Sequence, residues 1–308
     1  MVKRVVITNY LGESVEYKIE GVDVESNNGL FITEIEGLGP PDADIIFTKM
    51  VNIDGSIYNS GRINGRNIVI KARFLYAKTI EEARLQSYRF FHIKKPLMFE
   101  IETDNRKVYT VGYVEKNEPN IFSNECDIQV SIMCEDAFFK DVNDYSEESF
   151  SAIEPLFEFV YENEGFEPVT EFGNRGNKTV ITITNKGDIE VGYTITFRAT
   201  GEVSKPSINF INTGESLTFD TGAIAKMSGG KQFDSGDEII LTMLDRTKTC
   251  YFYNSSTGQY VNILNLVDQD FSWPKLTPGP TNMYHVSADY GEDYLRVYID
   301  YQVLYEGV

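Results

Sequence analysis

Histidine and tryptophan are scarce in this chain of 308 residues, which contains only His92, His285 and Trp273. Histidine is the side chain most often used as a general acid or base near neutral pH. Neither histidine stands in a Ser/His/Asp or Cys/His arrangement typical of nucleophilic catalysis, and we interpret both as ordinary surface or core residues. We therefore expect that the protein is not an enzyme, and that it has no catalytic, cofactor-binding or metal-binding residues and no cofactor.

Cysteine is also rare, with residues only at Cys126, Cys134 and Cys250. The first two fall in one alternating, strand-like segment, which at about 3.3 Å per residue places them roughly 26 Å apart. This separation excludes a disulfide between them. No two cysteines are spaced as a pair of zinc ligands, and Cys250 has the pattern of a small core residue. The sequence therefore predicts that the cysteines are reduced, as in cytoplasmic proteins.

Positive charge and long apolar runs are lacking as well. The chain has 28 Lys and Arg against 47 Asp and Glu, a net charge of −19. This argues against a nucleic-acid binder, which needs basic side chains along the phosphates, and favours a role of the charge in keeping an aromatic-rich protein soluble. No segment approaches the roughly 18 apolar residues of a membrane helix, and residues 1–8 resemble a strand rather than a secretory signal. We expect synthesis in a cytoplasm and no membrane insertion.

Three segments contain only part of a known ligand-binding motif. Gly229-Gly230-Lys231 lacks the first glycine of a phosphate loop and is interpreted as a turn. The acidic loops at 52–56 and 141–144 lack the 12-residue ligand pattern of a calcium loop. The distance between the two catalytic carboxylates of a glycoside hydrolase is set by the fold and does not appear in the sequence. A cell-wall hydrolase therefore stays an alternative.

What the chain has in abundance is Phe and Tyr, 20 and 19 residues, which alternate with β-branched residues as in half-buried strands. About 300 residues predict two domains, and the composition becomes acidic and rich in Gly and Pro between 141 and 176. We predict a mainly β protein: an N-terminal β-sandwich or barrel-like domain with one α-helix at 1–140, a linker at 141–176, and a C-terminal jelly-roll sandwich at 177–308. The predicted strands are Lys3–Thr8, Val15–Glu20, Leu30–Ile35, Asn67–Tyr76, Leu97–Glu102, Lys107–Glu115, Asn124–Cys134, Thr179–Thr184, Val191–Thr200, Ser207–Ile211, Ser216–Phe219, Glu238–Leu244, Thr249–Tyr253, Met283–Ser287 and Tyr294–Tyr305.

The helix is expected over Thr79–Phe91. Thr79 and Glu82 have the spacing of a capping box, in which the threonine hydroxyl accepts from a free amide of the first turn. An apolar stripe is expected to cover a sheet face. Its members are Ile80, Ala83, Tyr88 and Phe91.

The segment from Gly37 to Arg66 is a connection of about 30 residues, much longer than usual. It nevertheless carries apolar side chains, which need a surface to pack against. We interpret it either as an extension that clasps a neighbouring subunit or as an arm folded on its own domain. The candidates for the subunit interface are Pro40, Pro41, Ile45, Phe47, Met50, Ile53 and Tyr58.

Trp273 is interpreted as a core or rim anchor, with stacking on a sugar ring as the alternative.

Several segments, taken in order, resemble the distal tail protein (Dit) family of long-tailed bacteriophages and prophages. They are Gly37-Leu38-Gly39-Pro40-Pro41, Asp54-Gly55-Ser56, the Asn67–Phe74 strand, the helix, Cys134-Glu135-Asp136-Ala137-Phe138-Phe139, the stretch from Trp273 to Asn282, and the final strand with Tyr301–Val308. The resemblance covers nearly the whole chain.

The resemblance implies a structural virion protein at the tail tip, made in the bacterial host cytoplasm. It implies a ring of copies of the chain, typically a hexamer, that joins the tail tube protein to a tail-associated lysin or fibre protein, while DNA passes through the channel without specific binding. It also implies that the C-terminal sandwich is galectin-like, although the His/Asn/Arg/Trp constellation of a galectin sugar site is not found in the sequence. The alternatives are a carbohydrate-binding host-adhesion module, a tail tube protein and, less favoured, a cell-wall hydrolase.

Overall fold

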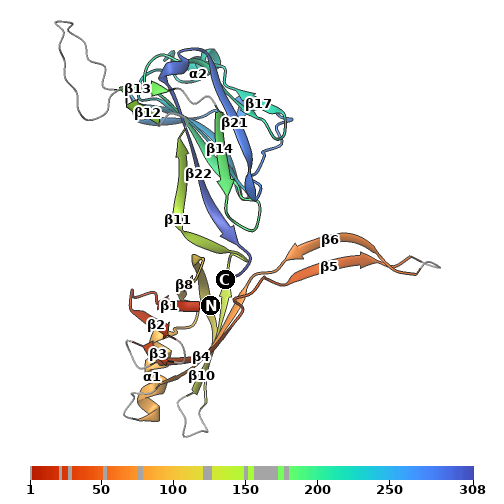
Figure 1. Cartoon of the computed structure of the whole chain (residues 1–308), viewed down its shortest axis with the longest axis vertical. Helices are drawn as coiled ribbons and strands as arrows, with labels where there is room; N and C mark the ends of the chain where they lie inside the picture. Colours follow the sequence, from red (N-terminus) through yellow and green to blue (C-terminus); the bar gives the residue numbers. More distant parts are fainter. Residues whose placement is uncertain are drawn as a thin grey trace, which may run out of the picture. The chain divides into compact units, whose positions relative to one another are not determined.

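The computed structural model describes residues 2–20, 23–26, 30–50, 54–74, 79–120, 127–148, 152–155, 173–176 and 180–308. The chain forms two compact units, residues 1–143 with 304–308 and residues 144–303 (Figure 1). The predicted mainly β class is confirmed, since strands dominate both units. Within the described residues, no helix is both long and apolar enough to span a membrane.

Unit 1 is built on one antiparallel sheet, in the order β4-β7-β10-β9-β8-β1-β2-β3. Side chains alternate between buried and exposed along β7 and β10, as the period-2 pattern predicts, so that Ile68, Ile70, Val130 and Ile132 form part of the core. The strands are β1 (Val2–Thr8), β2 (Ser14–Glu20), β3 (Asp23–Ser26), β4 (Leu30–Glu36), β7 (Asn67–Phe74), β8 (Pro96–Thr103), β9 (Lys107–Pro119) and β10 (Asp127–Cys134), and β11 (Phe139–Glu148) begins in this unit.

Helix α1 (Ile80–Phe90) confirms the predicted helix and its cap. The Thr79 hydroxyl accepts a hydrogen bond from the backbone N–H of Glu82 at 3.1 Å. The predicted apolar stripe is wrong at Tyr88, which is 45% exposed. Ala83 and Phe91 are buried as predicted, and the helix also buries Ser87 and Phe90.

Unit 2 is a β-sandwich. One sheet has the order β20-β19-β18-β15-β22 and the other β14-β21-β16-β17. The ring of Tyr193 on β15 lies 5.9 Å from that of Tyr284 on β21, so aromatic side chains join the inner faces of the two sheets. The strands are β14 (Val180–Asn185), β15 (Tyr193–Ala199), β16 (Ser204–Phe210), β17 (Glu215–Thr218), β18 (Glu238–Leu244), β19 (Thr247–Asn254), β20 (Gln259–Asn262), β21 (Gly279–Tyr290) and β22 (Leu295–Tyr305), with β12 (Ala152–Pro155) and β13 (Gly173–Gly176) paired separately.

A second helix, α2 (Thr221–Met227), was not predicted from the sequence. Asp220 caps it by accepting from the backbone N–H groups of Gly222 and Ala223. The helix has seven residues and includes a glycine, so it gives a weak helical pattern. Two short 3-10 turns complete the unit, η1 (Leu264–Leu266) and η2 (Glu292–Tyr294).

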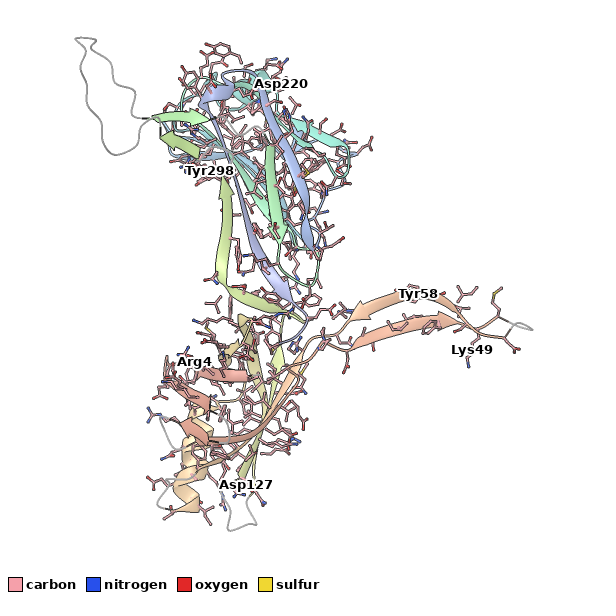
Figure 2. The ribbon with its side chains drawn as sticks, in the orientation of Figure 1. Arg4, Lys49, Tyr58, Asp127, Asp220 and Tyr298 are labelled. Carbon is pink, nitrogen blue, oxygen red and sulfur yellow. The ribbon has the colours of Figure 1, made fainter. Side chains whose placement is uncertain are left out.

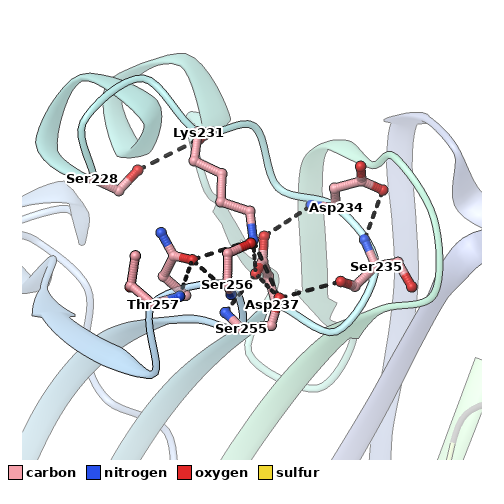
Figure 3. A network of polar contacts seen from close by, with 9 residues as sticks. Ser228, Lys231, Asp234, Ser235, Asp237, Ser255, Ser256 and Thr257 are labelled. Atoms are coloured by element: carbon pink, nitrogen blue, oxygen red, sulfur yellow. Dashed lines mark hydrogen bonds and ion pairs between the residues drawn. The ribbon is translucent and has the colours of Figure 1, made fainter.

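A polar network joins Lys231, in the turn predicted from the Gly-Gly-Lys sequence after α2, to residues 234–237 and 254–257 (Figure 3). The Lys231 Nζ is 2.7 Å from Oδ1 of Asp237, whose side chain is fully buried. The backbone N–H and the hydroxyl of Ser255 also donate to Asp237. Burial alone would raise the pKa of Asp237, but the hydrogen bonds from Lys231 and Ser255 outweigh it and hold the pKa below its ordinary value.

This network predicts an acid-sensitive stability of unit 2. Because the folded-state pKa of Asp237 is lowered, its stabilisation is present above the unfolded pKa of about 4 and is lost as pH falls through the folded value. Asp237→Asn should lower the free energy of unfolding by about 3 kcal/mol at pH 7, and this difference should shrink below pH 4. Urea unfolding followed by the fluorescence of Trp273, which lies in unit 2, measures it. Asp300→Asn, at an exposed position, is the matched control, and an equal loss in both variants would contradict the account.

Both cysteines in the described residues are free and buried, at Cys134 and Cys250. Burial raises the pKa of the Cys250 thiol to about 12, which keeps it protonated and unreactive at neutral pH. Cys126 lies outside the described residues.

Candidate assembly surface

The long connection between β4 and β7 forms a hairpin, which we call the arm, of β5 (Ala43–Thr48) and β6 (Ile57–Ile63). In the described residues, β5 and β6 pair only with each other (Figure 1). Every side chain on both strands is exposed. The expected alternative, an arm folded on its own domain, is therefore wrong, because no described part of unit 1 covers these strands.

The arm exposes large apolar side chains, each between 45% and 59% accessible. They are Ile45, Ile46, Phe47, Met50, Ile57, Tyr58 and Ile63. The rings of Phe47 and Tyr58 pack edge to face at 6.1 Å across the two strands, and Figure 2 shows Tyr58 and Lys49 along the hairpin. Apolar patches of this kind on a single chain mark interaction sites, because leaving them in water costs free energy.

The predicted interface residues therefore fall into three groups. Ile45, Phe47, Met50 and Tyr58 are exposed on the arm, whereas Pro40 is exposed and Pro41 half-buried at its root. Ile53 lies outside the described residues. The sequence-based list omitted three exposed members of the patch, Ile46, Ile57 and Ile63. Both faces of a two-stranded ribbon are open, so the usual division into a buried and a solvent face does not apply to it.

The root of the arm is held by Arg66, which is only 3% exposed. Its Nη1 donates to the backbone carbonyls of Gly37 and Gly39, both at 2.5 Å, at the start of the connection. Its Nε donates to the carbonyl of Ala137 at 2.9 Å and its Nη2 to that of Glu306 at 2.5 Å. One guanidinium thus joins three chain segments that are distant in sequence.

The electrostatics of this position are unusual, because the described partners of Arg66 are carbonyls and an aromatic ring. The guanidinium carbon lies 4.1 Å from the ring centroid of Phe139. Burial lowers the pKa of Arg66, but arginine starts so high that the side chain stays charged. The charge strengthens each hydrogen bond and makes the position intolerant of a neutral residue.

A glycine completes the root. Gly37 has φ of 86° and lies so close to the backbone carbonyl of Asn67 that a Cβ atom would collide with it. Residues 307 and 308 pack on the same turn, where the backbone N–H of Val308 donates to the carbonyl of Leu38 at 3.1 Å. The chain direction at which the arm leaves the sheet is therefore fixed by backbone contacts.

The two histidines and the single tryptophan lie on different parts of the chain. His92 is exposed in unit 1 next to the ring of Tyr10, and His285 is half-buried on β21 of unit 2. Trp273 is half-buried, packs against Phe271, and has the Lys248 Nζ 5.4 Å from its ring centroid. This is the environment of a rim anchor, and stacking of Trp273 on a sugar stays a prediction. No group of His, Cys, Asp and Glu that could hold a metal ion occurs among the residues that the structure describes.

Comparison with solved structures defines the class of fold. No protein-family model matches the chain, and no curated protein matches it. The Dit protein of phage SPP1, described as a paradigm of the hub adsorption apparatus of phages that infect Gram-positive bacteria, has a TM-score of 0.61 at 11% identity, over 96% of this chain and 98% of that chain. Chains of the phage P2 baseplate in its activated conformation cover 98% and 97% of this chain, with TM-scores of 0.42 with Ca and 0.40 with Sr, both at 11% identity.

At 11% identity the likeness to the SPP1 protein is one of fold. The chain has a distal tail protein fold, and the resemblance predicted from its motifs is confirmed at that level. That fold comprises, in this chain, a β unit with one helix and the arm, followed by a β-sandwich.

The root of the arm generates a prediction about stability. Arg66→Ala leaves four carbonyls without their donor and should lower the free energy of unfolding of unit 1 by about 3 kcal/mol. Urea unfolding followed by circular dichroism measures it, while the fluorescence of Trp273 in unit 2 should change at the same urea concentration as in the wild type. Arg62→Ala, on the exposed arm, is the matched control and should stay within about 0.5 kcal/mol. Equal effects of the two substitutions would contradict the role assigned to Arg66.

Proposed function

We propose that this protein is the distal tail hub of a long-tailed bacteriophage, a structural ring at the tail tip. The observation that carries the proposal is the arm, whose apolar side chains have no cover within the described chain, on a protein that shares the fold of the SPP1 Dit protein along nearly its whole length. Leaving such a surface in water costs free energy, which is recovered when another molecule covers it. A second copy of the chain is the partner that a hub supplies.

A ring follows from the shape of this contact. An arm that packs on a different surface of the next copy makes a head-to-tail contact, and such contacts close into rings when the rotation between copies allows it. We expect a hexamer, with the tail tube protein on one side and a tail-associated lysin or fibre protein on the other. In such a ring the net charge of −19 on each copy repels DNA, which would pass through the channel without adhering.

The arm can be tested with point substitutions that leave the fold alone. Phe47→Lys places a charge in the apolar patch and should weaken assembly by at least tenfold, since burying an unpaired charge at an interface costs several kcal/mol. Sedimentation measures the mass in solution over a range of concentrations, and circular dichroism checks the fold. Leu85→Lys is the matched control, an exposed leucine of α1 that should leave the mass unchanged.

The deletion of residues 42–61, replaced by a two-residue turn, is the stronger form of this test. The shortened protein should fold, because the arm contributes nothing to the described core of unit 1. It should also remain monomeric. Full rings formed by a folded protein without the arm would show that the arm does not hold the ring together.

A further inference from the structure

A groove of about 510 Å³ runs along an edge strand of unit 2. Two runs of residues line it, 216–218 on β17 and 265–269 around the end of η1. Consecutive side chains of a strand point to opposite faces of the sheet. A groove that borders three consecutive residues therefore lies along the edge of the strand. β17 is the last strand of its sheet, and among the described strands it pairs only with β16.

The backbone of β17 directs hydrogen-bonding groups toward this groove. In an antiparallel pair, every second residue bonds to the neighbouring strand, and the residues between them point away from it. The backbone N–H of Phe219 donates to the carbonyl of Pro206 at 3.0 Å, and the register continues so that Leu217 has the same orientation. The N–H and C=O groups of Ser216 and Thr218 therefore point away from β16. Within the described residues they have no hydrogen-bond partner.

The edge of β17 is not protected by the devices that block strand pairing in many proteins. Lysine, proline and β-bulges are typical of exposed edges. β17 contains neither lysine nor proline, and its register with β16 has no bulge. It has four residues, so it suits a short added segment.

The groove has the size of a short added strand. A strand rises about 3.3 Å per residue, lies about 4.8 Å from its neighbour and, with side chains on both faces, is about 10 Å thick, so three residues fill roughly 480 Å³. This is close to the 510 Å³ of the groove. A small molecule fits less well, because small-molecule sites are mostly apolar, whereas five of the eight lining residues are polar.

The lining also indicates the chemistry of the added segment. Its exposed side chains carry hydroxyl, amide and carboxylate groups. The backbone N–H of Asp270 donates to Oδ1 of Asp268, and neither carboxylate forms an ion pair with a described cation. A lysine or arginine in the segment complements this charge. The arm of a second copy is a poor match, because it exposes apolar side chains on both strands.

We propose that the edge of β17 binds an extended segment of a different protein by strand addition. The segment forms backbone hydrogen bonds with Ser216 and Thr218 and places a basic side chain near Asp268. In contacts of this kind the main-chain hydrogen bonds supply affinity, and the side chains at alternate positions supply specificity. The contact needs only one copy of the chain, so it goes beyond the proposed hub function and does not depend on ring formation.

Peptides selected on the intact protein from a display library of random linear sequences test the proposal. Selected peptides should contain lysine or arginine and bind one per chain, as measured by titration calorimetry. Ser216→Pro removes an outward N–H at a position where an edge strand tolerates proline. It should weaken binding about tenfold or more, because a hydrogen bond is lost and the ring blocks the approaching strand. Ser216→Ala keeps the N–H and is the matched control, with binding within about twofold of the wild type.

A second measurement uses the wild-type protein and modified peptides, so it does not depend on how a variant folds. Every second N–H of a strand faces one neighbour, so N-methylation of one alternate set of peptide amides should abolish binding, and methylation of the other set should leave it. Asp268→Asn should weaken binding about threefold and reduce its dependence on salt.

Three results would overturn this inference: a selection that yields no binding peptide, peptides that bind Ser216→Pro as tightly as the wild type, or equal binding of the two methylated forms. Each would leave the hub proposal standing, because the ring does not use the edge of β17. Sedimentation of Ser216→Pro should accordingly give the same mass as the wild type.

Discussion

The structure depends on one constraint: a two-stranded ribbon has no inner face. Each strand of the arm places alternate side chains on opposite sides, and with no second layer both sides meet water. Isolated hairpins are marginally stable, yet this one exposes isoleucine, phenylalanine and tyrosine side chains on both strands. The partner surface that we propose would cover these side chains.

The rest of unit 1 holds this ribbon in a defined direction. Arg66 joins the start of the connection to residues 137 and 306 through charged hydrogen bonds to carbonyls, and Gly37 provides the backbone geometry that a larger residue would block. A buried charge with backbone partners is costly to assemble and costly to disturb. A fixed root limits the orientations that the arm samples, which lowers the entropic cost of association.

The sequence predicted the regular elements well. The helix and its Thr79 cap, the β7 strand and the strand rhythm of the sandwich all follow from local periodicity and capping chemistry. The arm was predicted as a long apolar connection but not as a hairpin, because the polar residues and glycine at Asn59-Ser60-Gly61 interrupt the alternation within β6. The exposure of Tyr88 and the short helix α2 were missed, since neither depends on a strong local signal.

Sequence alone does not predict the features that are formed by segments distant along the chain. Arg66 looks like any other arginine until carbonyls from residues 37, 39, 137 and 306 surround it. Unit 1 also has an apolar cavity, lined by residues of β1, β2 and β4 that include Val5 and Tyr17, and by Leu38 just after β4, and no residue pattern in the sequence reveals it. Both features adjoin the arm's root, through Gly37 and Leu38 respectively.

The most direct test of the central claim is the mass of the intact protein in solution, measured by sedimentation over a wide range of concentrations. The account predicts one closed species of fixed stoichiometry, in equilibrium with monomer and without open-ended growth. A protein that stays strictly monomeric at every concentration, with its apolar arm in water, would contradict it.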